Sequence, residues 1–365
     1  MKFRYVFLLA ISICIFGLIG CAPKQKGELL GRKDPLSPID LKAGINSISF
    51  YSQGSRISGN LFLPPDLKEG KSLPVVIMVA PESGIKEQSP GNYAQRLSIK
   101  GFAVLAFDHR TFGQSEGQPR LLEDPFMKIE DVKNAVSYVR SLKIIDPHKV
   151  GVIGICAGGG YAVTTAAFDI RIKAVATVSG IFDLADYRPN TRNPDAIKYF
   201  NNILHLAGEG RQKFFESGNT PYTQGAFYGE EPEGDKTLNA YYGGSIQMEQ
   251  YSKLFWKRAF DYYHDPSRGQ FKSWADKRLN AALDSRFMIN ASSYVHLISP
   301  RPILIIKGSK AISGRMSDAA FSKAQDPKEL FIIEGAHHFD LYDSKEPLDQ
   351  ATEKLHTFFK NAFDI

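Results

Sequence analysis

An apolar run that ends in a glycine-flanked cysteine constrains the fold of this chain more than any other feature. Val150–Ile155 leads through Gly154-Ile-Cys156-Ala-Gly158 into a helix-compatible sequence. The pattern predicts a strand that passes into a helix through one sharp turn, with a strained central residue and small flanking residues. At the helix N-terminus, the dipole and free backbone N–H groups favour a reactive thiolate. A buried core cysteine beside a glycine-rich turn is the alternative.

The N-terminus predicts export. Lys2 and Arg4 precede an apolar stretch at residues 5–20, which is followed by Cys21-Ala-Pro-Lys. This is the pattern of a secretory signal, and its Leu-Ile-Gly-Cys ending resembles a bacterial lipobox, which implies cleavage before Cys21 and lipidation of its thiol. We therefore expect a signal at residues 1–21, a tether at 22–43 and an exported bacterial lipoprotein anchored in a membrane. Ala22 suggests the outer membrane, facing the periplasm, in a Gram-negative host. A retained transmembrane anchor is the alternative.

Cys156 is the one thiol that the predicted mature chain leaves free. Of three cysteines, Cys14 leaves with the signal and Cys21 carries lipid, so an unpaired cysteine in an exported protein suggests a reactive role. The small excess of Lys and Arg (45) over Asp and Glu (39) is spread along the chain, and we expect no nucleic-acid partner. Without His-Glu-x-x-His, Cys-x-x-Cys or a phosphate-loop lysine, we expect no metal or cofactor.

Apolar runs alternate with amphipathic segments along most of the chain, which predicts an α/β fold with a mainly parallel, doubly wound sheet. The first two predicted strands look like an antiparallel hairpin. Strands are expected at residues 47–51, 57–63, 73–80, 103–107, 150–155, 174–179, 302–307 and 329–333. Helices are expected at residues 92–100, 126–142, 157–168, from 317 onward and at 347–363.

The alternation disappears for about a hundred residues after Asp186, where Tyr, Phe, Gly and Asn are frequent. Such a length is uncommon for a loop inside a compact domain. We therefore expect an inserted helical cap at residues 186–297, between the sixth and seventh strands. The core is then formed by residues 44–185 and 298–365.

Several stretches across the predicted mature chain match one known group. They are Gly84–Gln88, Phe107–Ser115 with Gly117–Arg120, Gly154–Tyr161, Pro300–Pro302, Pro327–Leu330 and His338–Asp343. Together they resemble α/β-hydrolases of the dienelactone-hydrolase-like kind, some of which carry cysteine at the turn between strand and helix. The resemblance implies the α/β-hydrolase fold and hydrolysis of a small ester, lactone or thioester through an acyl-cysteine intermediate.

The loop after the last predicted strand offers a base for Cys156. His338 is preferred because Gly-Ala-x-His spaces it just beyond the strand, and His337 is the second choice. This placement follows the α/β-hydrolase order of nucleophile, acid and histidine. A surface histidine pair is the alternative.

The acid of a catalytic triad is harder to place, because residues 308–316 contain no carboxylate. Asp183, after the preceding strand, and Asp318, at the start of the next helix, are both candidates. A Cys–His pair without an acid is a third possibility, since a thiol needs less help to ionise than a hydroxyl.

The oxyanion hole is expected to combine the backbone N–H of Ala157 with one from the loop after the third strand, at Glu82 or Ser83. Glu82 resembles a glutamate of dienelactone hydrolase that interacts with the cysteine thiol. It could hold the thiol neutral at rest or deprotonate it when substrate arrives. A solvated loop carboxylate is the alternative.

These features predict a lipid-anchored cysteine hydrolase that acts on a small acyl substrate beneath an aromatic cap. Many hydrolases of the resembled group carry His-Pro and small residues in the oxyanion loop, and this chain departs from that pattern. This departure and the missing acid leave a second interpretation, a catalytically decayed hydrolase-fold lipoprotein that serves as a binding or envelope-structural protein. A redox sensor ranks last, because the chain has no resolving cysteine.

Overall fold

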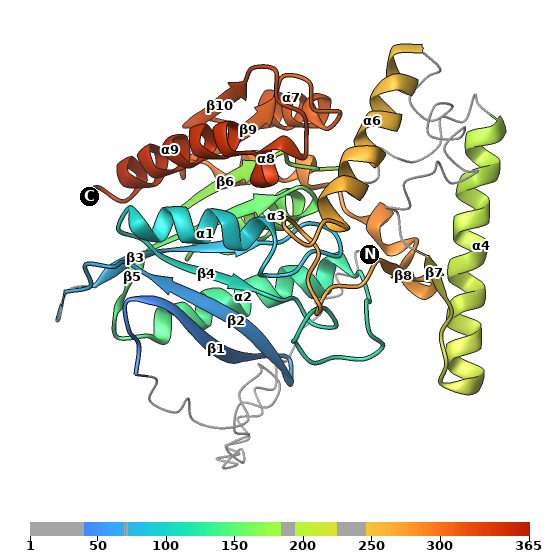
Figure 1. The fold of residues 1–365 in the computed structure, drawn as a ribbon, viewed down its shortest axis with the longest axis horizontal. Helices are drawn as coiled ribbons and strands as arrows, with labels where there is room; N and C mark the ends of the chain where they lie inside the picture. Colours follow the sequence, from blue (N-terminus) through green and yellow to red (C-terminus); the bar gives the residue numbers. More distant parts are fainter. Residues whose placement is uncertain (1–39, 69, 71, 184–193, 225–245) are drawn as a thin grey trace, which may run out of the picture.

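A computed structural model describes residues 40–68, 70, 72–183, 194–224 and 246–365 of the chain (Figure 1). The predicted signal with Cys21, and most of the predicted tether, lie outside these residues. An eight-stranded sheet forms the centre, with the strand order β1-β2-β4-β3-β5-β6-β9-β10. β4 lies on one side of β3 and β5 lies on the other. The chain therefore extends the sheet in both directions from β3, as in a doubly wound sheet.

The sheet begins with an antiparallel hairpin and continues as parallel strands. β1 (Gly44–Ser52) pairs with β2 (Ser55–Leu63), and β2 also runs antiparallel to β4 (Ala103–Phe107). The other pairs are parallel, so the predicted strand arrangement is confirmed. The parallel strands are β3 (Leu73–Val79), β4, β5 (Ile145–Ile155), β6 (Ala174–Val178), β9 (Ile303–Gly308) and β10 (Lys328–Ile333).

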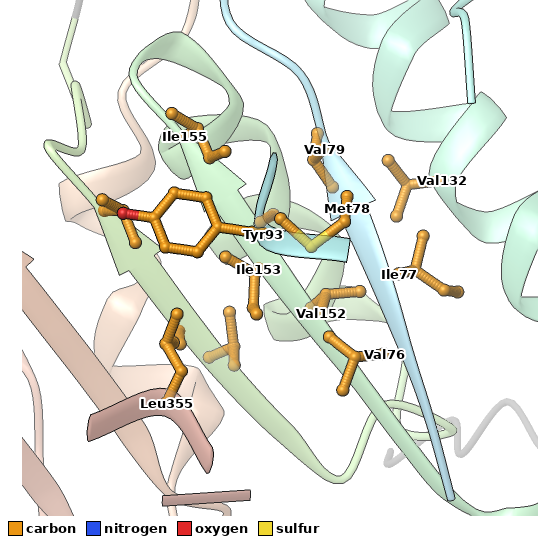
Figure 2. Close-up of a cluster of buried hydrophobic side chains, with 14 of the residues drawn as sticks. Val76, Ile77, Met78, Val79, Tyr93, Val132, Val152, Ile153, Ile155 and Leu355 are labelled. Carbon is orange, nitrogen blue, oxygen red and sulfur yellow. The ribbon is translucent and has the colours of Figure 1, made fainter. Parts of the chain in front are cut away.

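Helices cover both faces of the sheet. α1 (Ser89–Ile99) packs against α9 (Lys345–Ala362), and α2 (Pro125–Ser141) packs against α3 (Ala157–Phe168). Figure 2 shows β3 and β5 between these layers, with Tyr93 of α1 and Leu355 of α9 close to the strands and Val132 of α2 beside β3. Burial on both faces explains why these strands are continuous apolar runs.

Two short helices follow the last two strands of the sheet, near the predicted base and one of the two candidate acids. α7 (Gly314–Lys323) follows β9, and α8 (Asp340–Asp343) follows β10. The helix predicted from residue 317 therefore begins three residues earlier. α1 also begins before its predicted start, because Pro90 occupies its first turn, where the missing N–H costs nothing.

The described part of the insertion between β6 and β9 includes the helices α4 (Pro194–Ser217) and α6 (Ile246–Tyr263); residues 186–193 and 225–245 of the predicted cap lie outside the described residues. It also contains a feature that the sequence did not predict, an antiparallel pair of β7 (Tyr222–Gln224) and β8 (Lys277–Leu279). Short 3₁₀ turns complete it. They are η3 (Asn280–Ala282), η4 (Ser285–Met288), η5 (Ala291–Ser293) and η6 (Val295–Ile298). Among the described helices, none has the length and apolar character needed to cross a bilayer.

Candidate active site

Cys156 lies at the sharp turn between β5 and α3, as predicted. Its backbone has a φ of 55° and a ψ of −126°, which is unfavourable for a residue with a side chain. A Cβ on Gly158 would lie 2.3 Å from the Val79 carbonyl oxygen, and one on Gly154 would lie 2.2 Å from the Gly158 carbonyl oxygen. Larger residues would therefore force strand and helix apart.

Two backbone N–H groups converge on the Cys156 sulfur. They belong to Ala157 and Glu82, and each is close enough to the sulfur to stabilise its thiolate form and so to lower the pKa of the thiol. Both residues were predicted to supply the oxyanion hole. The prediction for Ser83 is wrong, because its N–H donates to Glu123 Oε2 at 3.0 Å. The structure thus brings together one donor from each of two loops.

The Cys156 thiol is neutral at rest. The residue is 8 % exposed, and this burial raises the pKa of its thiol to about 11, although hydrogen bonds from Tyr342, Ala157 and Glu82 act in the opposite direction. The sequence-based expectation of a thiolate favoured by the helix terminus is therefore wrong for the resting protein. Desolvation of the charged form outweighs the helix N-terminus.

His338 lies in the loop between β10 and α8 and is 2 % exposed. Its Nδ1 is 2.8 Å from Ser313 Oγ, its Nε2 is 3.3 Å from the Tyr342 hydroxyl, and its carbonyl accepts a hydrogen bond from Ser179 Oγ. Burial lowers the pKa of His338 to about 3, so the imidazole is neutral. His337 instead donates its backbone N–H to Asp340 and lies partly exposed beside it.

Ser313 occupies the position where the sequence analysis sought a carboxylate. It precedes α7 in the loop after β9 and is 2 % exposed. Neither predicted acid is placed there. Asp318 lies on α7, more than half exposed, and pairs with Lys307, whereas Asp183 forms a backbone bridge with Asn290 after β6. The loop at residues 308–316 does supply the third member, but as a hydroxyl, for which a search limited to carboxylates gave no signal.

Tyr342 is a site residue that the sequence analysis missed. Its side chain is fully buried, and its hydroxyl contacts both the Cys156 sulfur and His338 Nε2. Within the described part of the chain, Cys156 and His338 share no direct hydrogen bond. The available signal was the place of Tyr342 in the stretch His338–Asp343, which matched the resembled group.

Two arginines from the insertion hold Glu82. Arg286 Nη1 is 3.2 Å and Arg278 Nη2 is 3.4 Å from Glu82 Oε1. Burial tends to raise the pKa of Glu82, but the positive charges of Arg278, Arg286 and Lys128 overcome it and lower the pKa. The Glu82 carboxylate is therefore ionised and paired. Its negative charge raises the pKa of the Cys156 thiol, which agrees with a role in keeping that thiol neutral.

A buried charged cluster supports the oxyanion loop from behind. Glu123 accepts hydrogen bonds from Ser83 N–H and from the Tyr161 hydroxyl at 2.9 Å, and it pairs with the Lys128 ammonium at 2.6 Å. Lys128 is fully buried and lies 4.4 Å from the centre of the Phe112 ring. A buried charge without its partner is strongly destabilising, so this cluster fixes the loop that contains Glu82.

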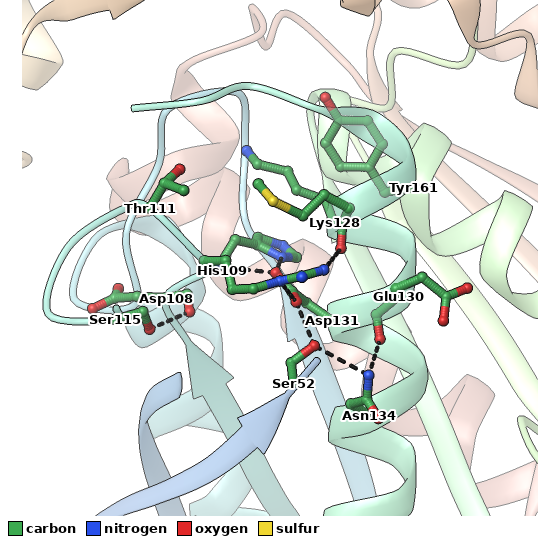
Figure 3. Close-up of polar contacts among 12 residues, drawn as sticks. Ser52, Asp108, His109, Thr111, Ser115, Lys128, Glu130, Asp131, Asn134 and Tyr161 are labelled. Carbon is green, nitrogen blue, oxygen red and sulfur yellow. Dashed lines mark hydrogen bonds and ion pairs between the residues drawn. The ribbon is translucent and has the colours of Figure 1, made fainter. Parts of the chain in front are cut away.

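The neighbouring turn after β4 is held in the same way. Figure 3 shows Asp131 of α2 beside Ser52 and His109. Asp131 accepts hydrogen bonds of 2.6 Å from both Ser52 Oγ and Arg110 Nε. Asp108 pairs with Lys86 at 2.7 Å. These contacts give structural roles to the matched stretches at residues 84–88 and 107–115. Among the described residues, no three His, Cys, Asp or Glu side chains gather as metal ligands would.

Comparison with known proteins agrees with this fold. The profile of the α/β hydrolase fold matches residues 86–345. The chain belongs to this family. Uncharacterized protein YcjY of Escherichia coli is 30 % identical over 86 % of this chain and 98 % of its own length. The crystal structure of hypothetical protein PA2218 from Pseudomonas aeruginosa superposes on this chain with a TM-score of 0.72 at 31 % identity. The superposition covers 89 % of this chain and 96 % of the PA2218 chain.

A shorter match carries a functional name. Thiohydrolase aneE of Aspergillus aculeatus is 32 % identical over 36 % of this α/β-hydrolase and 39 % of its own length. Family membership supports the hydrolase activity that the sequence predicted.

Proposed function

We propose that this α/β-hydrolase cleaves a small ester, lactone or thioester through an acyl-cysteine intermediate. The observation that carries the proposal is the convergence of the Ala157 and Glu82 N–H groups on the sulfur of Cys156, which is held in a strained turn. Donors fixed around a nucleophile are suited to the oxyanion that forms when it attacks a carbonyl. The name of the partly matching thiohydrolase favours a thioester among these substrates.

The reaction begins when the Cys156 proton moves to His338. The sulfur then forms a bond to the substrate carbonyl carbon, and the two N–H groups of Ala157 and Glu82 stabilise the oxyanion. Collapse of this intermediate breaks the bond to the leaving group, which takes the proton from His338. Water, deprotonated by His338, cleaves the acyl-cysteine and restores the thiol. The imidazole stays in one orientation because Ser313 holds its Nδ1.

Aromatic side chains of α6 support an apolar acyl group. The Phe255 ring lies 5.2 Å from the His338 ring and 5.1 Å from the Trp256 ring, between ring centres. Tyr263 is 2 % exposed and close enough to Cys156 for the two groups to affect each other's charge. Walls of this kind bind apolar groups and exclude water.

The test compares four forms of the purified full chain with p-nitrophenyl butyrate and a butyryl thioester. We expect turnover by the wild type, a loss of at least about 100-fold in Cys156→Ala and His338→Ala, and near wild-type turnover in His337→Ala as the matched control. Mass spectrometry should detect the acyl group on Cys156. A wild type that neither turns over nor becomes acylated would contradict the proposal and favour a binding protein.

We also propose that the protein is exported and anchored through lipid on Cys21, in the outer membrane facing the periplasm of a Gram-negative host. The proposal rests on the signal pattern and the cysteine that ends it. Metabolic labelling with an alkyne fatty acid should mark the wild type and leave Cys21→Ala unlabelled. Equal labelling of both would exclude this anchor.

A further inference from the structure

The Tyr342 hydroxyl stands between the nucleophile and the base. His338 Nε2 is 3.3 Å from this hydroxyl, and the same hydroxyl is close enough to the Cys156 sulfur for each group to shift the pKa of the other. No direct hydrogen bond joins the sulfur and the imidazole within the described residues. The proton that must leave the thiol therefore has one side chain in its path.

We propose that Tyr342 is a catalytic residue that relays the proton from Cys156 to His338. This inference rests on the proposed function and adds a third group to its chemistry. The thiol gives its proton to the Tyr342 oxygen while the Tyr342 hydroxyl proton passes to His338 Nε2. The sulfur electron pair forms the bond to the substrate carbonyl carbon. Tyr342 is neutral before and after, and His338 has gained the single proton that Cys156 lost.

The backbone around Tyr342 is held from two sides. From α1, the Tyr93 hydroxyl donates to the Leu341 carbonyl at 2.7 Å, and Asn92 Nδ2 donates to the Tyr342 carbonyl at 3.0 Å. From the insertion, Arg268 binds both carboxylate oxygens of Asp343 at 2.6 and 2.8 Å. These bonds fix the backbone of α8 and therefore the position from which the Tyr342 side chain extends toward Cys156 and His338.

Packing alone does not account for the hydroxyl. The Tyr342 ring lies 4.8 Å from the Phe339 ring and 5.1 Å from the Tyr262 ring, between ring centres, and a phenylalanine would keep these contacts. Burial holds the pKa of Tyr342 well above its usual value, so a free tyrosinate is unfavourable. Receipt and release of a proton must then occur together, which is what a relay requires.

The experiment measures single-turnover acylation of Cys156 by p-nitrophenyl butyrate in the full chain at pH 7. We expect Tyr342→Phe to slow acylation by about 100-fold or more without a large change in melting temperature. Tyr262→Phe, which removes another buried hydroxyl from the same aromatic cluster, should acylate like the wild type. In mixtures of H₂O and D₂O, the wild-type rate should curve downward, because two protons move in one step.

Two results would overturn the relay. Acylation of Tyr342→Phe at the wild-type rate or faster would show that the hydroxyl only fills or blocks the path, and a linear isotope plot for the wild type would show a single moving proton. If Tyr342→Phe does not fold, 3,5-difluorotyrosine at this position keeps the ring and acidifies the hydroxyl. A relay then predicts a changed acylation rate, and an unchanged rate would overturn it.

The same assay separates this inference from the proposed function. A Tyr342→Phe rate equal to wild type, together with losses in Cys156→Ala and His338→Ala, would overturn the relay alone. A wild type that is not acylated would overturn both.

Discussion

Ser313 gives His338 a neutral partner at the position where a catalytic triad has a charged one. A carboxylate beside Nδ1 stabilises the imidazolium that forms during catalysis. Here the neutral Ser313 hydroxyl lies at 2.8 Å instead, and no negative charge in the described part of the chain offsets the effect of burial on the imidazole. Burial therefore lowers the pKa of His338 to about 3. Each pKa unit corresponds to about 1.4 kcal/mol. The site therefore combines a weak base with a weakly acidic thiol, and it needs substrate to drive the proton transfer.

Ser313→Asp should restore the charged partner. We expect the pKa of His338 to rise by about 1 to 3, because an adjacent negative charge favours the imidazolium. A base with a pKa nearer to neutral pH is more effective, so kcat/KM at pH 8 should rise about tenfold and an acidic limb should enter the pH profile. NMR titration of His338 and the pH dependence of kcat/KM are the measurements.

Ser322→Asp is the control for this variant, because it adds the same charge to an exposed position of α7. It should leave both readings unchanged. An unaltered His338 titration in Ser313→Asp would argue that the new carboxyl is itself protonated in the buried site.

At the scale of elements, the insertion is part of the site as well as a cover. Arg278 of β8 and Arg286 of η4 bind Glu82, whose N–H contacts the sulfur from one side. Arg258 of α6 pairs with Asp340 of α8, the helix that carries Tyr342 on the other side. Any movement of the insertion would therefore displace both the Glu82 N–H and the Tyr342 hydroxyl.

Most elements of the core could be predicted because their signals are local. An apolar run such as Ala103–Phe107 or the glycine pair around Cys156 is readable within a few residues, and these elements lie where the sequence placed them. The pairing of β7 with β8 could not be predicted, because it joins segments more than fifty residues apart through only three residues each.

The site shows the same division. Cys156, Ala157 and His338 belong to local motifs, and the structure brings them together. Ser313 and Tyr342 matter through distant contacts and carry no charge at neutral pH, so a search for a carboxylate passed over them. The raised pKa of the thiol follows from burial by the whole fold, which a motif does not report.

For the molecule as a whole, buried neutral histidines make stability dependent on pH. Burial lowers the pKa of both His338 and His109, which are 2 % and 0 % exposed. In the unfolded chain a histidine binds its proton near pH 6.5. The unfolded state therefore holds more protons than the native state below that pH, and the stabilisation present above pH 6.5 is lost as the pH falls toward the low native value.

This linkage predicts a fall in the free energy of unfolding between pH 7 and pH 5, of about 2 kcal/mol from His338 and with a contribution of the same sign from His109. Urea unfolding of the full chain at the two pH values measures it. His338→Gln should reduce the fall by about 2 kcal/mol, whereas His148→Gln, at an exposed position, should not. An identical fall in wild type and His338→Gln would mean that the native protein protonates His338 as readily as the unfolded chain does. The neutral imidazole on which both the relay and the acylation step depend would then be lost near pH 6.5.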